Sequence, residues 1–313
     1  MRILVSGSSG LIGSALLRSL SAAGHTAVRL VRATRTPAAG DVAWDPAGGH
    51  IENTSLEGFD AVVHLAGESI AGGRWTAQRK QCISDSRITS TRLLSQSLAG
   101  LNRPPGVLIA ASAVGFYGDR GDELLTESSP AGSGFLAEIC KQWEAASQLG
   151  ARRGIRVVNL RFGMVLAAHG GALATMLPAF RLGLGGPLGP GNQWVSWIAL
   201  DDVLGVIEHA IADERLRGPV NTVAPAAVTN REFGRTLGRV LDRPAVLTLP
   251  AFVLRLALGE LADALLLASD RVCPQRLQAS GYRFLHPDLE PALRHVLRPD
   301  PQRKRIAGDL RSV

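Results

Sequence analysis

The chain opens with an apolar run, Ile3–Val5, that passes directly into a glycine-rich turn, Gly7–Gly13, and then into an apolar stretch of helical character, Ser14–Leu20. In such a turn the first glycine permits the sharp change of direction, the second lets backbone N–H groups approach a pyrophosphate, and the third lets the helix pack closely on the strand. The helix N-terminus then faces the phosphates and favours an anion. A second apolar run, Thr26–Val31, follows. This order predicts a dinucleotide-binding site rather than a bare surface turn.

The residues after the second apolar run indicate which dinucleotide is bound. Sites that prefer NAD place an Asp or Glu there, about twenty residues beyond the glycines, to hold the ribose 2′-hydroxyl. This chain has no acidic residue between Gly13 and Asp41, and the run ends instead with Arg32 and Arg35. A guanidinium donates charge-assisted hydrogen bonds to a phosphate. The pattern predicts NADP(H), with Arg32, nearer the strand, as the better of the two candidates; solvated surface arginines are the alternative.

Length and composition limit the possible domain organisation and the classes of site that the chain can contain. With 313 residues, 46% of them hydrophobic, the chain can bury a large core, as one large α/β domain or as a nucleotide-binding domain with a smaller cap. Cys82, Cys140 and Cys273 are far apart and form no Cys-x-x-Cys pair, so we expect neither a disulfide framework nor a zinc site, and predict no metal. Met1-Arg2 leads straight into the first strand without a signal-peptide pattern. We expect a cytoplasmic protein.

Two segments raise the question of other partners. The net charge of +7 and the basic residues between Arg298 and Arg311 could suit nucleic acid, but no nucleic-acid-binding motif accompanies them. A solvated basic tail, 301–313, is the favoured interpretation. The most apolar long stretch, Ala245–Ala268, is interrupted by Pro250 and by charged residues, which predicts a buried amphipathic helix rather than a membrane span.

Apolar runs alternate with helical patterns through the first half of the chain. This alternation predicts an α/β fold: a doubly wound parallel Rossmann sheet with helices on both faces. The segments between Thr229 and Leu297 lack comparable strands and suit a smaller, mainly helical C-terminal substrate cap. We assign 1–170 to an NADP-binding Rossmann domain to which 195–225 return, and 171–194 and 226–300 to the cap. The expected strands are Ile3–Ser6, Ala27–Val31, Ala61–Leu65, Val107–Ala111 and Arg156–Leu160, and the expected helices between them are Ser14–Ala23, Trp75–Ser97 and Phe135–Ala151.

Small or polar residues end the expected strands, at the edge where doubly wound sheets bind their ligands. The run Asp60–Glu68 ends in Ala66-Gly67, which permits close backbone approach. His64 within it is expected to pack beneath the site rather than act in it. Ser112 ends the next run, where its hydroxyl either faces a substrate oxygen or caps the following turn.

A second glycine-rich segment, Gly183–Gln193, is too irregular for a packed element and too long for a hairpin turn. It predicts a binding loop or lid. Of the two tryptophans that follow, Trp197 is expected to anchor the loop to the core, whereas Trp194 could do so or flank a ligand. One residue of the Asp201-Asp202 pair is placed to cap a helix over Val203–Ile211.

Short motifs that occur together in one superfamily run through nearly the whole chain. They are Gly7-x-x-Gly10-x-x-Gly13, His64-Leu65-Ala66-Gly67-Glu68, Arg74-Trp75-Thr76, Ser86-Arg87, Ser112-Ala113-Val114-Gly115-Phe116-Tyr117-Gly118, Trp143-Glu144, Leu160-Arg161-Phe162-Gly163, Gly183-x-Gly185-Gly186, Ser196-Trp197-Ile198, Trp197-x-x-x-Asp201-Asp202 and Arg271-Val272-x-Pro274. In these motifs the chain resembles the extended, epimerase-like members of the short-chain dehydrogenase/reductase superfamily, and more closely an atypical subfamily with a short helical C-terminal domain. The resemblance implies an NADP-binding Rossmann domain with a substrate cap.

The resemblance also implies contacts with the cofactor, among them Arg87, which stands where many extended members have Asn. The contacts that it implies are Gly7, Ser9, Gly10, Leu11, Ile12, Arg32, Ala66, Gly67, Glu68 and Arg87. Gly13 of the turn, Arg35 and Leu65 complete the predicted cofactor site.

The catalytic dyad of the superfamily is missing from the sequence. Active members place Tyr-x-x-x-Lys on the helix after the serine strand, because the Tyr transfers a proton as hydride moves and the Lys lowers the pKa of that Tyr. Neither of the two tyrosines has a Lys four residues later. On the expected helix the Tyr position falls at Phe135 or Leu136 and the Lys position near Cys140. Lys141 lies about 100° further around the helix and cannot simply substitute.

Three hypotheses follow, in order of preference. The first is an NADP(H)-binding, epimerase-like oxidoreductase that acts on a nucleotide sugar or a small carbonyl or hydroxyl compound. Its catalytic candidates are Ser112 and Tyr117, with Glu138 and Cys140 as weaker ones. The second is a non-catalytic module that senses NADPH and regulates a partner, and the third is a nucleic-acid-associated protein. The sequence does not identify the substrate, and it is compatible with a monomer or a homodimer.

Overall fold

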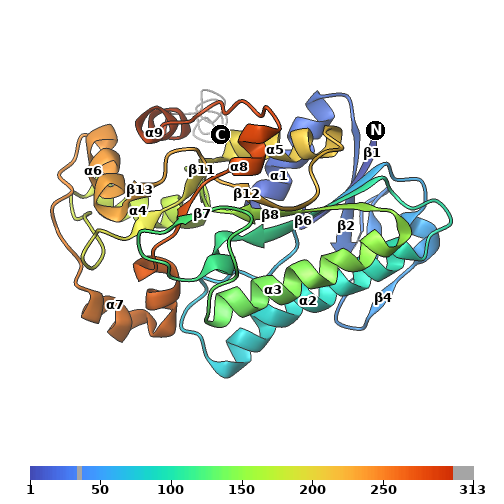
Figure 1. Ribbon diagram of the computed structural model, residues 1–313, viewed down its shortest axis with the longest axis horizontal. Coiled ribbons are helices and arrows are strands. Elements are labelled where there is room, and N and C mark those ends of the chain that lie inside the picture. Colours follow the sequence, from blue (N-terminus) through green and yellow to red (C-terminus); the bar gives the residue numbers. More distant parts are fainter. Residues whose placement is uncertain (34–36, 299–313) are drawn as a thin grey trace, which may run out of the picture.

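The computed structural model describes residues 1–33 and 37–298. Within these residues the centre of the molecule is an eight-stranded sheet with helices on both faces (Figure 1). Its neighbouring strands pair in parallel, except that β4 runs antiparallel to β3. The predicted α/β fold with a doubly wound parallel sheet is confirmed. In spatial order the strands are β12 (Gly218–Thr222), β8 (Arg156–Phe162), β6 (Val107–Ala113), β5 (Ala61–His64), β1 (Arg2–Ser6), β2 (Thr26–Arg32), β3 (Val42–Asp45) and β4 (His50–Ile51).

Alternating side chains of the inner strands divide the core into two layers. Ile3 and Val5 of β1 point to the face covered by α1 and α5, and Leu4 points to the face covered by α2. This period-two alternation is the reason that both faces of the sheet are apolar and need a helical cover. The helices are α1 (Leu11–Ala22) and α5 (Leu200–Ala212) on one face, and α2 (Ala77–Ala99), α3 (Phe135–Ser147) and the 3₁₀ segment η3 (Gln148–Arg153) on the other, with α2 and α3 side by side (Figure 1).

Helices α4 (Gly171–Arg181), α6 (Asn230–Leu241) and α7 (Ala251–Leu258) form a smaller, mainly helical part at one end of the molecule (Figure 1). Its core is built around Trp197, which is fully buried and whose Nε1 donates to the carbonyl oxygen of Ala226. The predicted anchoring role of Trp197 is confirmed. The remaining elements are η1 (Asn53–Leu56), η2 (Val114–Tyr117), β7 (Leu124–Leu125), β9 (Met164–Leu166), β10 (Trp194–Val195), β11 (Trp197–Ala199), β13 (Val228–Thr229), the π-helical segment η4 (Ala262–Leu267), β14 (Arg271–Val272), α8 (Gln275–Ala279) and α9 (Leu289–Val296).

The apolar stretch Ala245–Ala268 is not the single buried helix that its composition predicts. Pro250 precedes α7, and Gly259, at a φ of +63°, ends it, so the stretch forms two short helical segments. Phe252 and Leu256 are 69% and 75% exposed. Across 1–33 and 37–298, none of the helices is both long and apolar enough to cross a membrane.

His64, at the end of β5, is fully buried in a chain of hydrogen bonds that joins β1, β5 and α2. Ser6 Oγ accepts from the N–H groups of the two residues that follow His64, so its own proton goes to His64 Nδ1, 2.6 Å away. The neutral ring therefore carries its proton on Nε2, which donates to Thr91 Oγ1 at 2.9 Å. Burial lowers the pKa of His64 to about 4. His64 is a packing residue beneath the glycine turn, as predicted.

We expect acid to destabilise the fold through His64. Its pKa rises from about 4 in the folded protein to 6.5 in the unfolded chain, so its contribution to stability is complete above pH 6.5 and is lost as the pH falls toward 4. At about 1.4 kcal/mol per pKa unit, the total loss is roughly 3 kcal/mol. His64→Gln, which keeps a donor and an acceptor, should remove this part of the pH dependence in denaturant titrations.

Asp270 changes the stability with pH in the opposite direction to His64, so its contribution has to be eliminated before the effect of His64 can be measured. Burial and the nearby Asp119 raise the pKa of Asp270 to about 7, so this carboxyl group stabilises the fold at low pH and loses that contribution as the pH rises from 3.8 to 7. His64 and His64→Gln are therefore compared in an Asp270→Asn background. Equal slopes of unfolding free energy against pH in the two proteins would contradict the assignment.

Candidate cofactor-binding and active site

The glycine turn after β1 presses against the end of β5. Gly7 has a φ of +66°, and a Cβ atom built on it would stand 2.6 Å from the carbonyl carbon of Leu65. A Cβ atom on Gly13 would stand 2.2 Å from the carbonyl oxygen of Gly7. Gly10, the N-cap of α1, contributes no side-chain hydrogen bond to the helix end. At these positions the turn carries no side chains, so its backbone N–H groups can approach the pyrophosphate of a dinucleotide.

Three further residues of the predicted cofactor site belong to the same turn. Ser9 is exposed, whereas Leu11 and Ile12 are half-buried. Both apolar side chains pack against the small cluster that contains Ala167 and Leu200. They fix the first turn of α1 in place and leave its backbone to face a ligand.

Arg32 is the last residue of β2 and is exposed. The parallel register places Ser6, the last residue of β1, opposite Leu30. Arg32 therefore stands two residues further along than the end of β1, level with the glycine turn. Arg35, the other predicted phosphate ligand, lies outside the described residues.

The first acidic residue after the glycine turn points away from this edge. Asp41 immediately precedes β3, at the amino end of that strand. Its two carboxylate oxygens accept from Arg29 Nε and Nη2 at 2.8 and 2.6 Å. The Arg29 guanidinium holds the pKa of Asp41 below its usual range. Asp41 therefore does not take the place of the acidic residue that binds the ribose 2′-hydroxyl in NAD sites.

Arg87 of α2 brings a cation to the end of β5. A Cβ atom on Gly67 would lie 3.4 Å from its guanidinium carbon. Arg87 donates to the carbonyl oxygens of Ile83 and Glu68 at 3.1 and 2.9 Å, and burial lowers its pKa. Within 1–33 and 37–298, no carboxylate forms an ion pair with Arg87. A half-buried guanidinium in this position favours an anionic ligand.

The backbone that follows β5 is held from both sides. The N–H groups of Leu65 and Ala66 donate to Ser6 Oγ at 3.1 and 3.3 Å. The Glu68 carboxylate pairs with Arg79 at 3.2 Å. This segment therefore keeps a fixed course along the edge where the glycine turn lies.

A buried ion pair lies at the carboxyl ends of β6 and β8. The register of these strands places Ser112 opposite Arg161, and both side chains meet Glu144 of α3. Glu144 accepts from Arg161 Nε and Nη2 at 2.7 and 2.8 Å, and Ser112 Oγ donates to the same carboxylate at 2.7 Å. The side chains of Arg161 and Glu144 are 3% and 12% exposed. Ser112 therefore has a carboxylate at hydrogen-bond distance.

Tyr117 lies beneath this ion pair. Its side chain is fully buried, and its hydroxyl accepts from Arg161 Nη1 at 2.9 Å. Asn221 Oδ1 at 2.7 Å and the carbonyl oxygen of Thr126 at 2.9 Å compete for the single proton of this hydroxyl. Burial raises the pKa of Tyr117. This position suits a residue that holds Arg161 better than one that gives a proton to a substrate.

Helix α3 presents apolar side chains at the positions of the missing dyad. Leu136 packs against the turn after β6, and Cys140, one helical turn later, is 3% exposed. Burial, with Glu144 nearby, raises the pKa of the Cys140 thiol to about 12, so the thiol is neutral near pH 7. Glu138 and Lys141 pair with each other at 2.8 Å on the outer, exposed side of the helix. None of these side chains replaces the dyad.

The second glycine-rich segment packs against the C-terminal part of the chain. A Cβ atom on Gly186 would stand 2.2 Å from the carbonyl oxygen of Leu247. The N–H of Leu188 donates to Asn230 Oδ1 at 2.8 Å. Trp194 is half-buried, and its Nε1 donates to an Asp122 oxygen at 2.8 Å. The segment is tied down at these points and is not a free lid.

Sequence reasoning assigned no chemical role to Glu144 and Arg161. Both were visible in motifs, Trp143-Glu144 and Leu160-Arg161-Phe162-Gly163. The available signal was a charged residue inside the apolar run of β8, because a buried arginine requires a carboxylate or several carbonyl groups. The partner could not be identified from the sequence, since it comes from a different element.

Comparison with known proteins identifies relatives over almost the whole chain. The family model of the NAD dependent epimerase/dehydratase family matches residues 3–222, and a domain of unknown function (DUF1731) matches residues 249–296. An epimerase family protein of Mycobacterium bovis is 45% identical over 292 residues, which cover 93% of this chain and 96% of that protein.

Two solved structures are similar in fold and in sequence. The crystal structure of human epimerase family protein SDR39U1 (isoform 2) with NADPH has a TM-score of 0.87 and 36% identity, covering 95% of this chain and 99% of the human one. That of a nucleoside-diphosphate sugar epimerase from Corynebacterium glutamicum has a TM-score of 0.78 and 33% identity, covering 100% of this chain and 68% of the other.

We expect that removing only one partner of the Arg161–Glu144 pair will strongly destabilise the fold. Arg161→Met leaves the buried carboxylate of Glu144 without its cationic partner, which should lower the free energy of unfolding by about 3–5 kcal/mol. The double variant Arg161→Met/Glu144→Leu should be more stable than the single one. Arg239→Met, which breaks the exposed pair with Glu290, is the matched control, with an expected loss below about 1 kcal/mol. Urea titrations measure all three; a double variant less stable than Arg161→Met would contradict the expectation.

Proposed function

Since the chain belongs to the NAD dependent epimerase/dehydratase family, we propose that it is an epimerase-like oxidoreductase that binds NADP(H) and acts on a nucleotide sugar or a small carbonyl or hydroxyl compound. The observation that carries this proposal is the Ser112 hydroxyl bonded to a buried carboxylate at the sheet edge where the glycine turn lies. The nucleotide-sugar class is supported by the similarity to the nucleoside-diphosphate sugar epimerase of Corynebacterium glutamicum.

The cofactor site is the backbone turn Gly7–Gly13 together with the segment Leu65–Glu68. Arg32 is the proposed ligand of the 2′-phosphate, because it lies level with the turn and Asp41 is engaged elsewhere. Arg87 supplies positive charge at the neighbouring strand end. The NADPH in the human relative's structure supports the choice of the phosphorylated cofactor. When bound, this cofactor gives or accepts the hydride.

Ser112 and Glu144 are the proposed proton path. In the oxidative direction Ser112 Oγ accepts the proton of a substrate hydroxyl and passes its own proton to Glu144 Oε1, 2.7 Å away. Reduction of a carbonyl runs the same transfers in reverse. Arg161 keeps the carboxylate oriented through two hydrogen bonds. Tyr117 enters this scheme as a positioning residue for Arg161.

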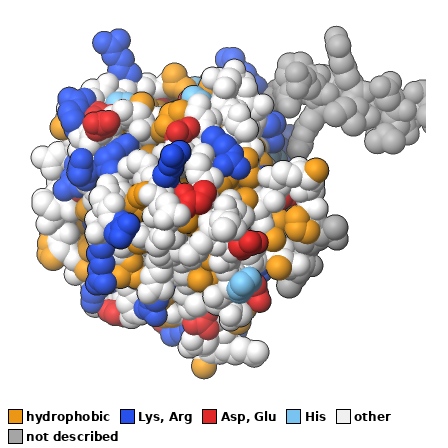
Figure 2. Space-filling model, turned by 90° about the vertical axis from the view of Figure 1, so that its right-hand side faces the viewer, with side chains coloured by type: hydrophobic (Ala, Val, Ile, Leu, Met, Phe, Trp, Pro, Cys, Tyr) orange, Lys and Arg blue, Asp and Glu red, His pale blue; other side chains and the backbone are white. Residues whose placement is uncertain are grey.

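A second function, NADPH sensing without turnover, is favoured by one observation. The face of α3 that carries the proton-transferring dyad elsewhere in the superfamily carries Leu136 and the neutral Cys140 here. A monomer or homodimer, a small-molecule partner and a cytoplasmic location stay predictions. A nucleic-acid partner is the least favoured: on the face shown in Figure 2, Lys and Arg side chains occur together with Asp and Glu.

Turnover separates the two functions. We expect the protein to oxidise or reduce a member of a panel of nucleotide sugars and small carbonyl compounds with NADP(H), and Ser112→Ala to slow that reaction by about a hundredfold or more. Glu144→Gln should act in the same direction, whereas Glu138→Gln, on the outer side of α3, should not. NADPH binding without turnover across the panel would reject the enzyme and leave the sensor.

Arg32 should determine the choice of cofactor. Losing a charge-assisted hydrogen bond removes about 1.5–3 kcal/mol, so Arg32→Ala should bind NADPH roughly 10- to 100-fold more weakly. Affinity for NADH should be unchanged. Arg18→Ala removes an exposed arginine from the middle of α1 and is the charge control. Calorimetric titration measures each affinity; equal affinities of the unaltered protein for NADPH and NADH would contradict a 2′-phosphate site.

A further inference from the structure

Two neighbouring carboxylates at the start of α5 serve different purposes. The helix begins at Leu200 with Ala199 as its N-cap, so the predicted capping role for Asp201 or Asp202 is wrong, and both lie in the first turn. Asp202 is fully buried and accepts from the N–H groups of Leu285 and His286 at 2.7 and 2.9 Å. Asp202 therefore fixes the course of the chain at residue 286. Asp201 points outward and takes no part in that contact.

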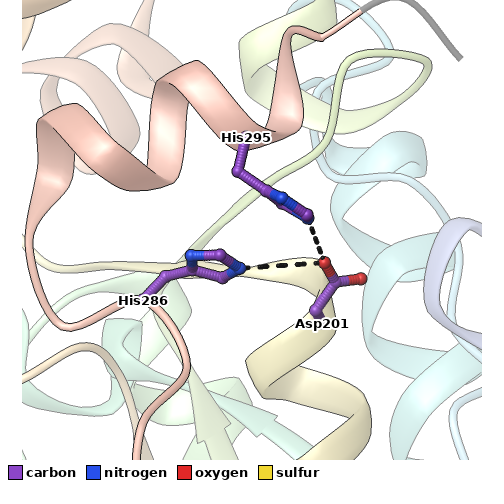
Figure 3. A group of neighbouring side chains, drawn as sticks. All are labelled: Asp201, His286 and His295. Atoms are coloured by element: carbon purple, nitrogen blue, oxygen red, sulfur yellow. Dashed lines mark hydrogen bonds and ion pairs between the residues drawn. The ribbon is translucent and has the colours of Figure 1, made fainter.

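Asp201 faces two imidazole rings that come from distant parts of the chain. His295 of α9 has its Nε2 at 2.6 Å from Asp201 Oδ2, and His286 has its Nε2 at 3.9 Å from the same oxygen (Figure 3). The two rings are stacked, with centroids 4.4 Å apart. One ligand atom from each of the three residues lies within 4.8 Å of the others. In 1–33 and 37–298 this is the single group of three His, Cys, Asp or Glu residues with such geometry.

An ion pair with His295 alone does not account for this arrangement. The dipole of α5 favours a carboxylate in its first turn, but it does not turn two imidazole nitrogens toward one oxygen. The 3.9 Å between His286 Nε2 and Asp201 is too long for a hydrogen bond. Among the described residues no other group accepts from, or donates to, that nitrogen. His286 is therefore aimed at the carboxylate and stops short of it.

The separations suit a shared metal ion. Ligands about 2.0–2.1 Å from a tetrahedral Zn²⁺ lie about 3.4 Å from one another. The observed 2.6 and 3.9 Å fall on either side of this value, so a small rotation of the exposed Asp201 side chain would equalise them. The donor set of two imidazoles and one carboxylate suits Zn²⁺ or Ni²⁺ and not Mg²⁺ or Ca²⁺, which prefer oxygen ligands.

We propose that Asp201, His286 and His295 form a site for a transition-metal dication such as Zn²⁺, which joins α9 to the start of α5. Solvent supplies the fourth ligand, because Asp201 and His295 are each 46% exposed. The site is partly preorganised, since Asp202 already holds the backbone of His286. It revises the prediction of no metal, which rested on the cysteine pattern. The ion would fasten a C-terminal helix to the sheet-bearing part of the chain.

Calorimetric titration of the untagged, chelator-treated full chain with ZnCl₂ tests the site. We expect one Zn²⁺ per chain, binding of Ni²⁺ and no heat from MgCl₂. Asp201→Asn, His286→Gln and His295→Gln should each weaken Zn²⁺ binding at least about tenfold. His50→Gln, which alters an exposed histidine of β4, should leave it unchanged. A Cys82→Ser background removes the exposed thiol as a competing ligand.

Thermal unfolding provides a second readout that does not depend on any activity. Zn²⁺ should raise the Tm of the Cys82→Ser protein and of its His50→Gln form, and should leave the Tm of the His295→Gln form unchanged. His295 is exposed, so this variant is expected to fold without metal. Absence of Zn²⁺ binding, or binding that survives all three ligand substitutions, would overturn the proposal.

Discussion

The buried guanidinium of Arg161 is the contact on which the arrangement of side chains at the ends of β6 and β8 depends. It fixes Glu144 of α3, and through Glu144 the hydroxyl of Ser112 on β6. It also holds Tyr117, whose hydroxyl reaches Asn221 of β12. Two strands, a helix and the edge of the sheet thus share one cation. A buried guanidinium is stable only while all its hydrogen-bond partners are in place. A network in which every polar group is satisfied holds these elements in one fixed arrangement.

The sequence predicted the inner sheet well because each inner strand consists mainly of apolar residues. It missed β3 and β4, which are short, and β12, which contains Pro219 and Asn221 and resembles a loop. Proline is tolerated in β12 because this strand lies at the edge of the sheet, next to β8 alone. Strand identity there depends on pairing with a distant partner, and no local pattern carries that information.

The site divides in the same way. The glycine turn and Arg32 follow from local spacing, so the sequence alone was enough to propose them as cofactor ligands, and their contacts with the cofactor stay a prediction. The contact of Ser112 with Glu144 needs both the register of β6 on β8 and the position of α3. The imidazole pair at Asp201 needs the C-terminal helix to return to α5, across more than ninety residues. Groups that meet only through tertiary structure left no signature that spacing could reveal.

The position of β12 has a consequence for how the chain reaches its native state. Strand β8 ends at Phe162, and its neighbour β12 begins only at Gly218, so 55 intervening residues must be looped out before the two can pair. The five parallel strands before β8 can associate in order of synthesis, whereas the edge that supplies Asn221 to Tyr117 has to wait. We therefore expect the strands up to β8 to assemble first on the ribosome, with one edge of β8 unpaired, and β12 to complete the sheet after the intervening segment has emerged.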